Sequence, residues 1–222
     1  MFKKSLILVL FLLGSLVVGA QQFFIESSLT TAYFKDYKND SGNPTLDNKY
    51  SKPLESGLGA GVIFPISKTR FLWDVGLNYN KYKINTSFVI GNTSTDTQYN
   101  LSYLSLKTGP SYTLVKLSRI LLQLHGHLSY SHFLQGTNRY LDVLVDLSSE
   151  IFDDSLLNYD YGLNTELAIT PQTSFYLSYN VKRSLKSIDV NDETYKLYAT
   201  SFYVGLRFQF KSIKKTEKQQ PK

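Results

Sequence analysis

Apolar and polar residues alternate along most of the chain. In the segment 71–80 the odd positions are apolar, and the even positions except Leu72 are polar or glycine. The segments 157–167, 175–182 and 202–210 repeat this pattern. Because alternate side chains of a β-strand leave opposite faces, each segment predicts a strand with one apolar face and one face of polar or small side chains.

The alternation predicts eight antiparallel strands, at residues 23–35, 56–66, 71–84, 98–114, 120–134, 156–169, 173–184 and 195–210. Each is long enough to cross a bilayer as a tilted strand, which takes about 9–11 residues. A change of phase near Tyr103 and Leu104 predicts a bulge in the fourth strand. Pro110 lies in the same strand, at a position that strands normally disfavour unless it is a bulge or a rim.

The predicted connections alternate in length. The short ones are 67–70, 115–119 and 170–172, and the long ones are 36–55, 85–97, 135–155 and 185–194. Bacterial outer-membrane barrels combine short periplasmic turns with longer outer loops. The sequence therefore predicts an all-β fold, an eight-stranded antiparallel up-and-down transmembrane β-barrel with both termini in the periplasm. Residues 140–152 fit either a short helix or a strand extension.

The first residues have the form of an export signal. Lys3 and Lys4 precede the apolar run 6–18, and small residues lead up to Gln21. The run is shorter than the roughly 20 apolar residues of a membrane-anchor helix, which is the alternative. We expect three parts, a cleaved signal peptide at 1–20, an outer-membrane β-barrel at 21–210 and a basic periplasmic tail at 211–222.

The net charge of +6 comes from the two ends of the chain. Lys3 and Lys4 lie in the leader, and the tail holds five lysines against Glu217, so acidic and basic residues balance in the body. A neutral body argues against nucleic-acid binding, which needs clustered cations on the folded part. The absence of cysteine excludes disulfides, thiol chemistry and a lipid on an N-terminal Cys.

The two faces of the predicted strands favour lipid on the outside. A soluble barrel such as a lipocalin turns its polar face to water, and that face is usually rich in Lys and Glu. Here the polar face is mostly Gly, Asn, Ser and Thr, which fit a narrow interior. The apolar face carries aromatic residues near strand ends, as bilayer interfaces do: Phe71, Trp73, Tyr79, Tyr99, Tyr159, Phe175, Tyr179 and Phe208. The alternative is that these rings fill a soluble core.

Two segments resemble known outer-membrane proteins. The last predicted strand, with apolar Phe202, Val204, Leu206, Phe208 and Phe210, resembles the terminal strand by which barrels are recognised for insertion by the barrel-assembly machinery. In that pattern the aromatic residue ends the chain, whereas here a tail follows.

The segment 103–110 resembles the fourth-strand region of small Bacteroidota outer-membrane β-barrel proteins of the PorT-like type, and the junction at Gln21 resembles exported proteins of those bacteria. The resemblance covers most of the mature chain. It implies the outer membrane as location and a periplasmic or secretion-system protein as partner.

Nine titratable residues are expected to point into the lumen: Glu26, Asp74, Lys107, His125, His127, Asp160, Glu166, Lys182 and Arg207. Glu26, Asp74, Glu166 and Arg207 lie at similar depth from the short-turn side, and the counted register places Arg207 nearly opposite Glu26. A buried charge needs a partner, so we interpret these four as a cluster that plugs the lumen. The alternatives are a proton or ion path and, less favoured, paired carboxylates of a hydrolase.

Two further motifs contain residue types that can bind a metal or act in catalysis. His125 and His127, two apart on one face, can ligate a metal, but no third ligand is evident in the sequence. His127-Leu128-Ser129 resembles the His-x-Ser pair of eight-stranded lipid A deacylase barrels, yet Leu141 occupies the place near which that family has its Glu. Without an acid to orient the histidine, His127 is a poor general base and Ser129 a poor nucleophile. We expect no metal, no cofactor and no enzymatic activity.

The expected function is therefore that of a non-enzymatic barrel with a side-chain-plugged lumen, acting through loop or tail contacts in envelope structure, adhesion or a secretion system. An outer-membrane enzyme acting on lipid or protein and a small gated pore are the alternatives. A plugged lumen is favoured because eight strands leave an interior that side chains can fill.

Overall fold

The computed structural model describes residues 22–38, 52–66, 69–90, 93–141, 143–147, 155–185, 188–190 and 193–210. Residues 1–21, the tail 211–222 and most of the predicted loop 36–55 lie outside this part of the chain. No helix among the described residues is long and apolar enough to span a membrane.

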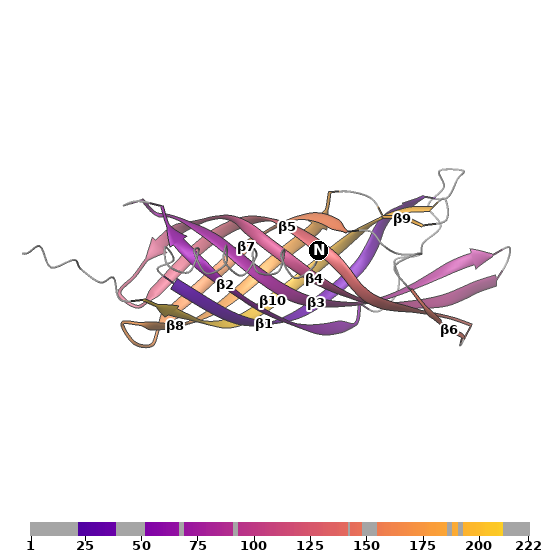
Figure 1. Ribbon diagram of the computed structural model, residues 1–222, viewed down its shortest axis with the longest axis horizontal. Helices are drawn as coiled ribbons and strands as arrows, with labels where there is room; N and C mark the ends of the chain where they lie inside the picture. Colours follow the sequence, from indigo (N-terminus) through magenta and orange to yellow (C-terminus); the bar gives the residue numbers. More distant parts are fainter. Residues whose placement is uncertain are drawn as a thin grey trace, which may run out of the picture.

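Within the described residues, eight antiparallel strands close into a barrel (Figure 1). They are β1 (Gln22–Lys38), β2 (Leu54–Pro65), β3 (Phe71–Ile90), β4 (Thr93–Lys116), β5 (Ile120–Tyr140), β7 (Leu156–Ala168), β8 (Thr173–Ser184) and β10 (Glu193–Gln209). Each strand pairs with the next, and β1 pairs with β10 to complete the ring. The predicted fold class and all eight predicted strands are confirmed.

The predicted long loops are partly wrong, because strands continue into them. β3 ends only at Ile90, and β4 already begins at Thr93. The predicted loop 85–97 is therefore the end of a long β3–β4 hairpin. β6 (Val143–Asp146) pairs with the end of β5, and β9 (Ile188–Val190) pairs with β10. Residues 85–97 are rich in Thr, Ser and Asn and show no alternation of apolar and polar residues. Backbone pairing does not need such alternation, so the pattern alone does not reveal these extensions.

The predicted change of phase near Tyr103 and Leu104 is wrong, because the inward positions of β4 stay odd from 101 to 111. The register shift opposite Ser102 and Tyr103 comes from an extra residue in β5, Leu134, and the extra residue of β4 lies at Leu114. Pro110 lies on the outer face opposite Trp73. The β4–β5 ladder is interrupted between Thr108 and Ser111, at the point where the proline has no N–H to donate. Pro110 is thus accommodated as a local gap in the ladder.

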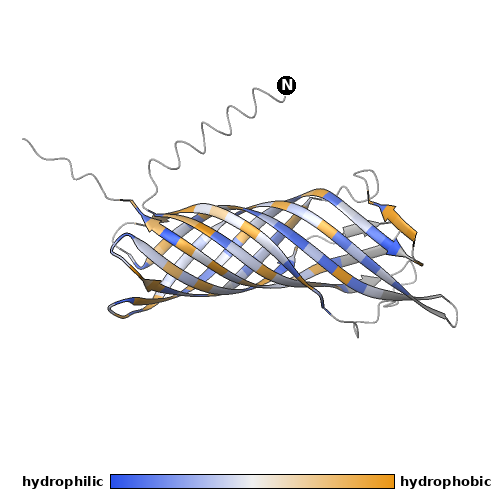
Figure 2. Ribbon diagram, turned by 90° about the horizontal axis from the view of Figure 1, so that it is seen from below, coloured by the Kyte–Doolittle hydropathy of each residue, from blue (hydrophilic) through white to orange (hydrophobic). Residues whose placement is uncertain are grey.

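The exterior is apolar and the interior polar, the reverse of a water-soluble barrel. In β7 every second residue is buried, and the exposed ones include Leu157, Leu163 and Leu167. Figure 2 shows the apolar positions distributed along the barrel wall. Because the apolar side chains of the wall point outward and are exposed, this surface is compatible with lipid and not with water.

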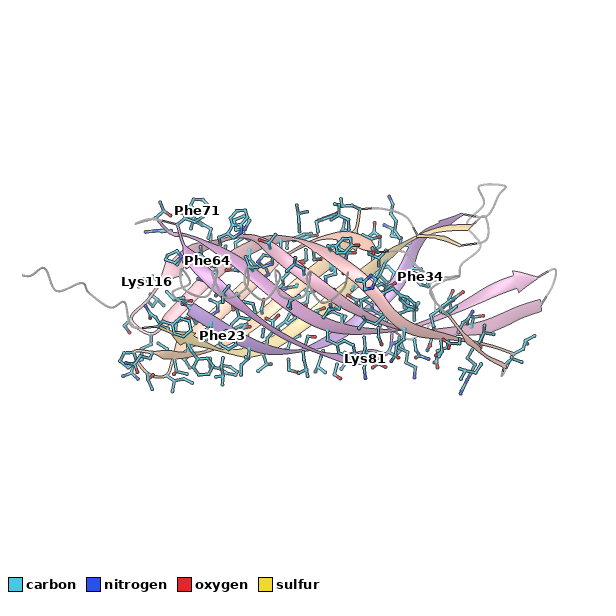
Figure 3. The ribbon with its side chains drawn as sticks, in the orientation of Figure 1. Phe23, Phe34, Phe64, Phe71, Lys81 and Lys116 are labelled. Carbon is cyan, nitrogen blue, oxygen red and sulfur yellow. The ribbon has the colours of Figure 1, made fainter. Side chains whose placement is uncertain are left out.

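Aromatic side chains mark the two edges of this wall. On neighbouring strands β1 and β10, Phe23 stacks on Phe208 at 6.5 Å and Tyr33 packs on Tyr198 at 5.6 Å between ring centroids. The two pairs are ten residues apart on each strand. At a tilt of about 35–45° this spacing rises about 24–28 Å, close to the roughly 25 Å apolar band of outer-membrane barrels. Figure 3 shows Phe23, with Phe64 and Phe71, at the end with the short turns. The protein is an integral outer-membrane-type barrel.

Candidate functional site

The nine titratable residues that alternation assigned to the lumen all lie in the interior, each no more than 8% exposed. They sit on seven strands, and seven of them form three hydrogen-bonded groups. The pairing of these charges decides what the lumen can do.

The first group centres on Arg207 of β10. Its Nη1 donates to Oε2 of Glu166 at 2.6 Å and to Oε1 of Gln123 at 2.8 Å. The guanidinium also lies over the ring of Tyr176, 4.7 Å from the ring centroid. Arg207 therefore joins β5, β7 and β8 across the interior.

The second group surrounds Glu26 of β1. Lys107 Nζ lies 2.5 Å from Oε1 of Glu26, Asn78 Nδ2 donates to the same oxygen at 2.6 Å, and the Tyr176 hydroxyl donates to Oε2 at 2.7 Å. Both carboxylate oxygens are thus satisfied by three strands other than β1. The Lys107 ammonium also lies 5.2 Å from the ring centroid of Tyr203.

The predicted pairing of Arg207 with Glu26 is wrong. In the β1–β10 ladder Arg207 lies opposite Phe24, and Glu26 lies opposite Gly205. Counting residues from the short turns does not locate partners, because strands in a barrel are staggered and ion pairs here form across the lumen. Each residue takes a different partner, Glu166 for Arg207 and Lys107 for Glu26.

The third group is a histidine held between two carboxylates. Nδ1 of His127 lies 3.0 Å from Asp160 Oδ1, and Nε2 lies 3.1 Å from Asp74 Oδ2. Ser111 Oγ donates to the same Asp74 oxygen at 2.5 Å. Ionised carboxylates only accept hydrogen bonds, so with Asp74 and Asp160 ionised both ring nitrogens donate and this geometry holds His127 as an imidazolium. His125 stacks on it at 4.9 Å between ring centroids.

The charges of the nine residues cancel in this arrangement. Four are carboxylates and three are the permanent cations Lys107, Lys182 and Arg207; protonated His127 supplies the fourth positive charge. Lys182 lies directly opposite Asp160 in the β7–β8 ladder. A neutral, hydrogen-bonded set of buried charges is stable where an unpaired charge would not be.

Apolar side chains close the lumen on both sides of the charged layer, which the sequence reading missed. Toward the outer extension these are Ala32, Phe34, Tyr82, Ile84, Leu101, Tyr103, Phe133, Leu147, Leu156, Leu197 and Ala199. Toward the short turns, Phe24, Ile63 and Tyr176 pack together with Leu72. The sequence does contain a signal for the outer plug, because the inward positions change from polar to apolar residues at Tyr82, Ile84, Leu101 and Tyr103.

Between the plugs, the charged layer borders one small cavity of about 30 Å³. Its lining includes Asp74 and Arg207, whose Oδ1 and Nε have no hydrogen-bond partner among the described residues. A space of this size suits one or two water molecules, at about 10–15 Å³ each, and no organic substrate. This cavity is therefore too small to hold an organic ligand.

The structure supplies a third ligand for the candidate metal site. His125, His127 and Asp160 can each offer one atom, all within 4.8 Å of one another. Asp160 lies directly opposite His127 on β7, a pairing that spacing along the chain does not reveal. However, both nitrogens of His127 already donate to carboxylates, and a divalent cation would unbalance a neutral interior. The geometry favours an ion bridge over a metal centre.

The His127–Ser129 pair is not arranged for nucleophilic catalysis. Ser129 is buried on the lumen side, 1% exposed, and its hydroxyl has no partner within the described residues. A general base must have a free ring nitrogen to take the serine proton, whereas both nitrogens of His127 are engaged by Asp74 and Asp160.

Comparisons with known proteins give a fold likeness only. No protein family matches the chain, and no curated protein matches it. Among solved structures, Neisserial surface protein A is 12% identical with a TM-score of 0.48, over 85% of this chain and 97% of that one. OprG from Pseudomonas aeruginosa is 14% identical, TM-score 0.45, over 87% and 98%. The Escherichia coli outer membrane protease OmpT is 11% identical, TM-score 0.46, over 86% and 97%.

Proposed function

We propose that this protein is a non-enzymatic outer-membrane barrel with a sealed lumen, which acts through contacts made by its outer extension. In this proposal the leader 1–20 is removed on export and the tail 211–222 lies in the periplasm. Two apolar plugs and a neutral charged layer support a lumen that carries neither substrate nor current.

The observation that carries the proposal is an exposed apolar hairpin at the end of β5. Leu141, Val143, Leu144 and Val145 are 66%, 61%, 61% and 42% exposed. Figure 1 shows β6 at the end of the molecule opposite the short turns. Leu141 lies 21 residues after Ile120, where β5 leaves its short turn. At a tilt of about 35–45° this spacing is about 50–58 Å along the barrel axis, well beyond the roughly 25 Å apolar band. Apolar side chains gathered so far from lipid are typical of a protein-contact site.

The hairpin turn is also strained. Leu141 has a φ of 48°, the left-handed region that Gly or Asn occupies at lower cost. Strain held at an exposed position suggests a use for that side chain. Among the described residues β6 pairs only with β5, so its other edge can receive an extended segment of a partner. The partner we propose is an envelope, adhesion or secretion-system protein.

Site-specific photocrosslinking in native cells tests the proposal. A photoreactive residue at Leu144 should give a discrete protein adduct, and Leu141→Asn with Val143→Thr should abolish it. Arg139→Gln is the matched control, since it changes an exposed polar residue of the same hairpin and should leave the adduct intact. An adduct that survives the apolar changes, or none in the wild type, contradicts the proposal.

Single-channel recording separates this function from the pore alternative. The purified barrel in a planar bilayer should show no steady conductance, because Tyr103 and its neighbours fill the outer plug. A stable open level in the wild type would favour the gated pore. Replacing Tyr103 by Ala should also give no steady conductance, because the charged layer below the outer plug still closes the lumen.

A further inference from the structure

A row of aromatic and cationic side chains crosses the outward-facing surface of the barrel. Tyr159 of β7 lies opposite Arg183 of β8, Arg183 opposite Tyr198 of β10, and Tyr198 opposite Tyr33 of β1. Lys52, just before β2, then places Nζ 4.1 Å from the ring centroid of Tyr33. The Arg183 guanidinium lies 5.3 Å from the centroid of Tyr198. The row thus joins cations to the tyrosines that mark the outer bilayer edge.

Two lysines directly above the row face each other. Lys35 of β1 and Lys196 of β10 are directly opposed in the ladder, and Lys35 Nζ lies 5.4 Å from the Tyr198 centroid. Like charges opposite each other destabilise a strand pair. Among the described outward-facing side chains of β1, β2, β8 and β10 there is no Asp or Glu. Lys35, Lys52, Arg183 and Lys196 are here called the outer cation belt, and the described residues of these strands offer them no counter-charge on this face.

The surface below the belt is apolar. Leu29, Leu58 and Phe202, on three of the same strands, are 48%, 65% and 43% exposed and lie on the lipid-facing wall. A ligand of this face therefore has acyl chains beside the wall and a negative headgroup at the level of the tyrosines. Phosphate fits best, because its oxygens accept charge-assisted hydrogen bonds from Lys and Arg together.

We propose that the outer cation belt binds the phosphate groups of a phosphorylated outer-leaflet lipid. The phosphate relieves the repulsion between Lys35 and Lys196, and the acyl chains pack beside Leu29 and Phe202. The inference rests on the outward orientation included in the proposed function. It does not involve the β5–β6 hairpin, so photocrosslinking at Leu144 and lipid binding at the belt can fail separately.

Lipid retention by the purified full barrel in maltoside micelles tests the site. The probe is lipid A carrying both phosphates, with dephosphorylated lipid A as the comparison and native mass spectrometry as the readout. The wild type should retain the phosphorylated probe, and Lys35→Gln with Lys196→Gln should reduce retention about tenfold, since each interfacial cation contributes measurably to anionic-lipid binding. Lys35→Arg with Lys196→Arg should retain binding. Arg139→Gln, on the extension above the bilayer, should have no effect.

Thermal unfolding of the same samples distinguishes binding from a structural role. Without phosphorylated lipid, the double Gln variant should melt at the same temperature as the wild type or higher, because the Lys–Lys repulsion is gone. With the lipid, the wild type should gain thermal stability and the double Gln variant should not. Equal retention of the dephosphorylated probe, unchanged retention by the double Gln variant, or no retention by the wild type would overturn the proposal.

Discussion

His127 of β5 and Asp160 of β7 are direct cross-strand partners, with Nδ1 of the imidazole 3.0 Å from a carboxylate oxygen. The other ring nitrogen, Nε2, lies 3.1 Å from a carboxylate oxygen of Asp74 on β3, beyond β4. One imidazolium therefore links a neighbouring strand and a distant one. Three strands of the barrel are held in register from the inside by this bridge.

Removing Asp160 should destabilise the barrel strongly. Asp160→Ala leaves His127 with one carboxylate and Lys182 without its opposed partner, and breaking a buried ion pair costs about 3–5 kcal/mol. Urea unfolding in lipid vesicles, followed by the fluorescence of the single tryptophan Trp73, measures the loss. Asp146→Ala, on the exposed β6, should cost no more than about 0.5 kcal/mol. Equal losses for the two variants would show that the bridge contributes nothing.

Arg207 should couple to Glu166 and not to Glu26. In double-mutant cycles, Arg207→Leu with Glu166→Gln should show an interaction energy of about 0.5–3 kcal/mol, as contacting charges do. The cycle of Arg207→Leu with Glu26→Gln should give a smaller value, because only Tyr176 connects them. The same unfolding assay applies. A larger coupling to Glu26 would restore the pairing that residue counting suggests.

Gly109 and Gly126 should differ in their tolerance of alanine. A Cβ on Gly109 would collide with the backbone oxygen of Gly126, in the gap of the ladder beside Pro110. A Cβ on Gly126 would find its nearest neighbour at 4.0 Å. Gly109→Ala should therefore lower the folded yield and the unfolding midpoint, while Gly126→Ala should behave as wild type. The heat-dependent mobility of the barrel in detergent gels reports the folded fraction.

The long-hairpin end should face outward from the cell. The chain has no cysteine, so a single one is a clean probe. On whole cells, Leu144→Cys in β6 should react with a membrane-impermeant maleimide, and Gln172→Cys in the short β7–β8 turn should react only after lysis. Labelling in the opposite order would reverse the orientation on which both proposals depend.

The number of strands and the faces of their side chains could be read from the sequence because both are local properties. A period of two places Asp74 and Trp73 on opposite faces wherever β3 lies in space. For the same reason the nine inward titratable residues follow from the phase of each strand. The outer parts of β3, β4 and β5 were not predicted, because apolar and polar residues do not alternate at 85–97 and 135–140.

Only the closed barrel decided which of these side chains meet. Lys107 and Glu26 are 81 residues apart, and Glu166 and Arg207 are 41 apart. Their contacts depend on the stagger between strands and on the width of the lumen, which closure of β1 against β10 sets for the whole ring at once. Closure likewise brings Lys35 beside Lys196 and Asp160 beside His127. A pattern along one strand contains no information about register with another, so these partners exist only in the tertiary structure.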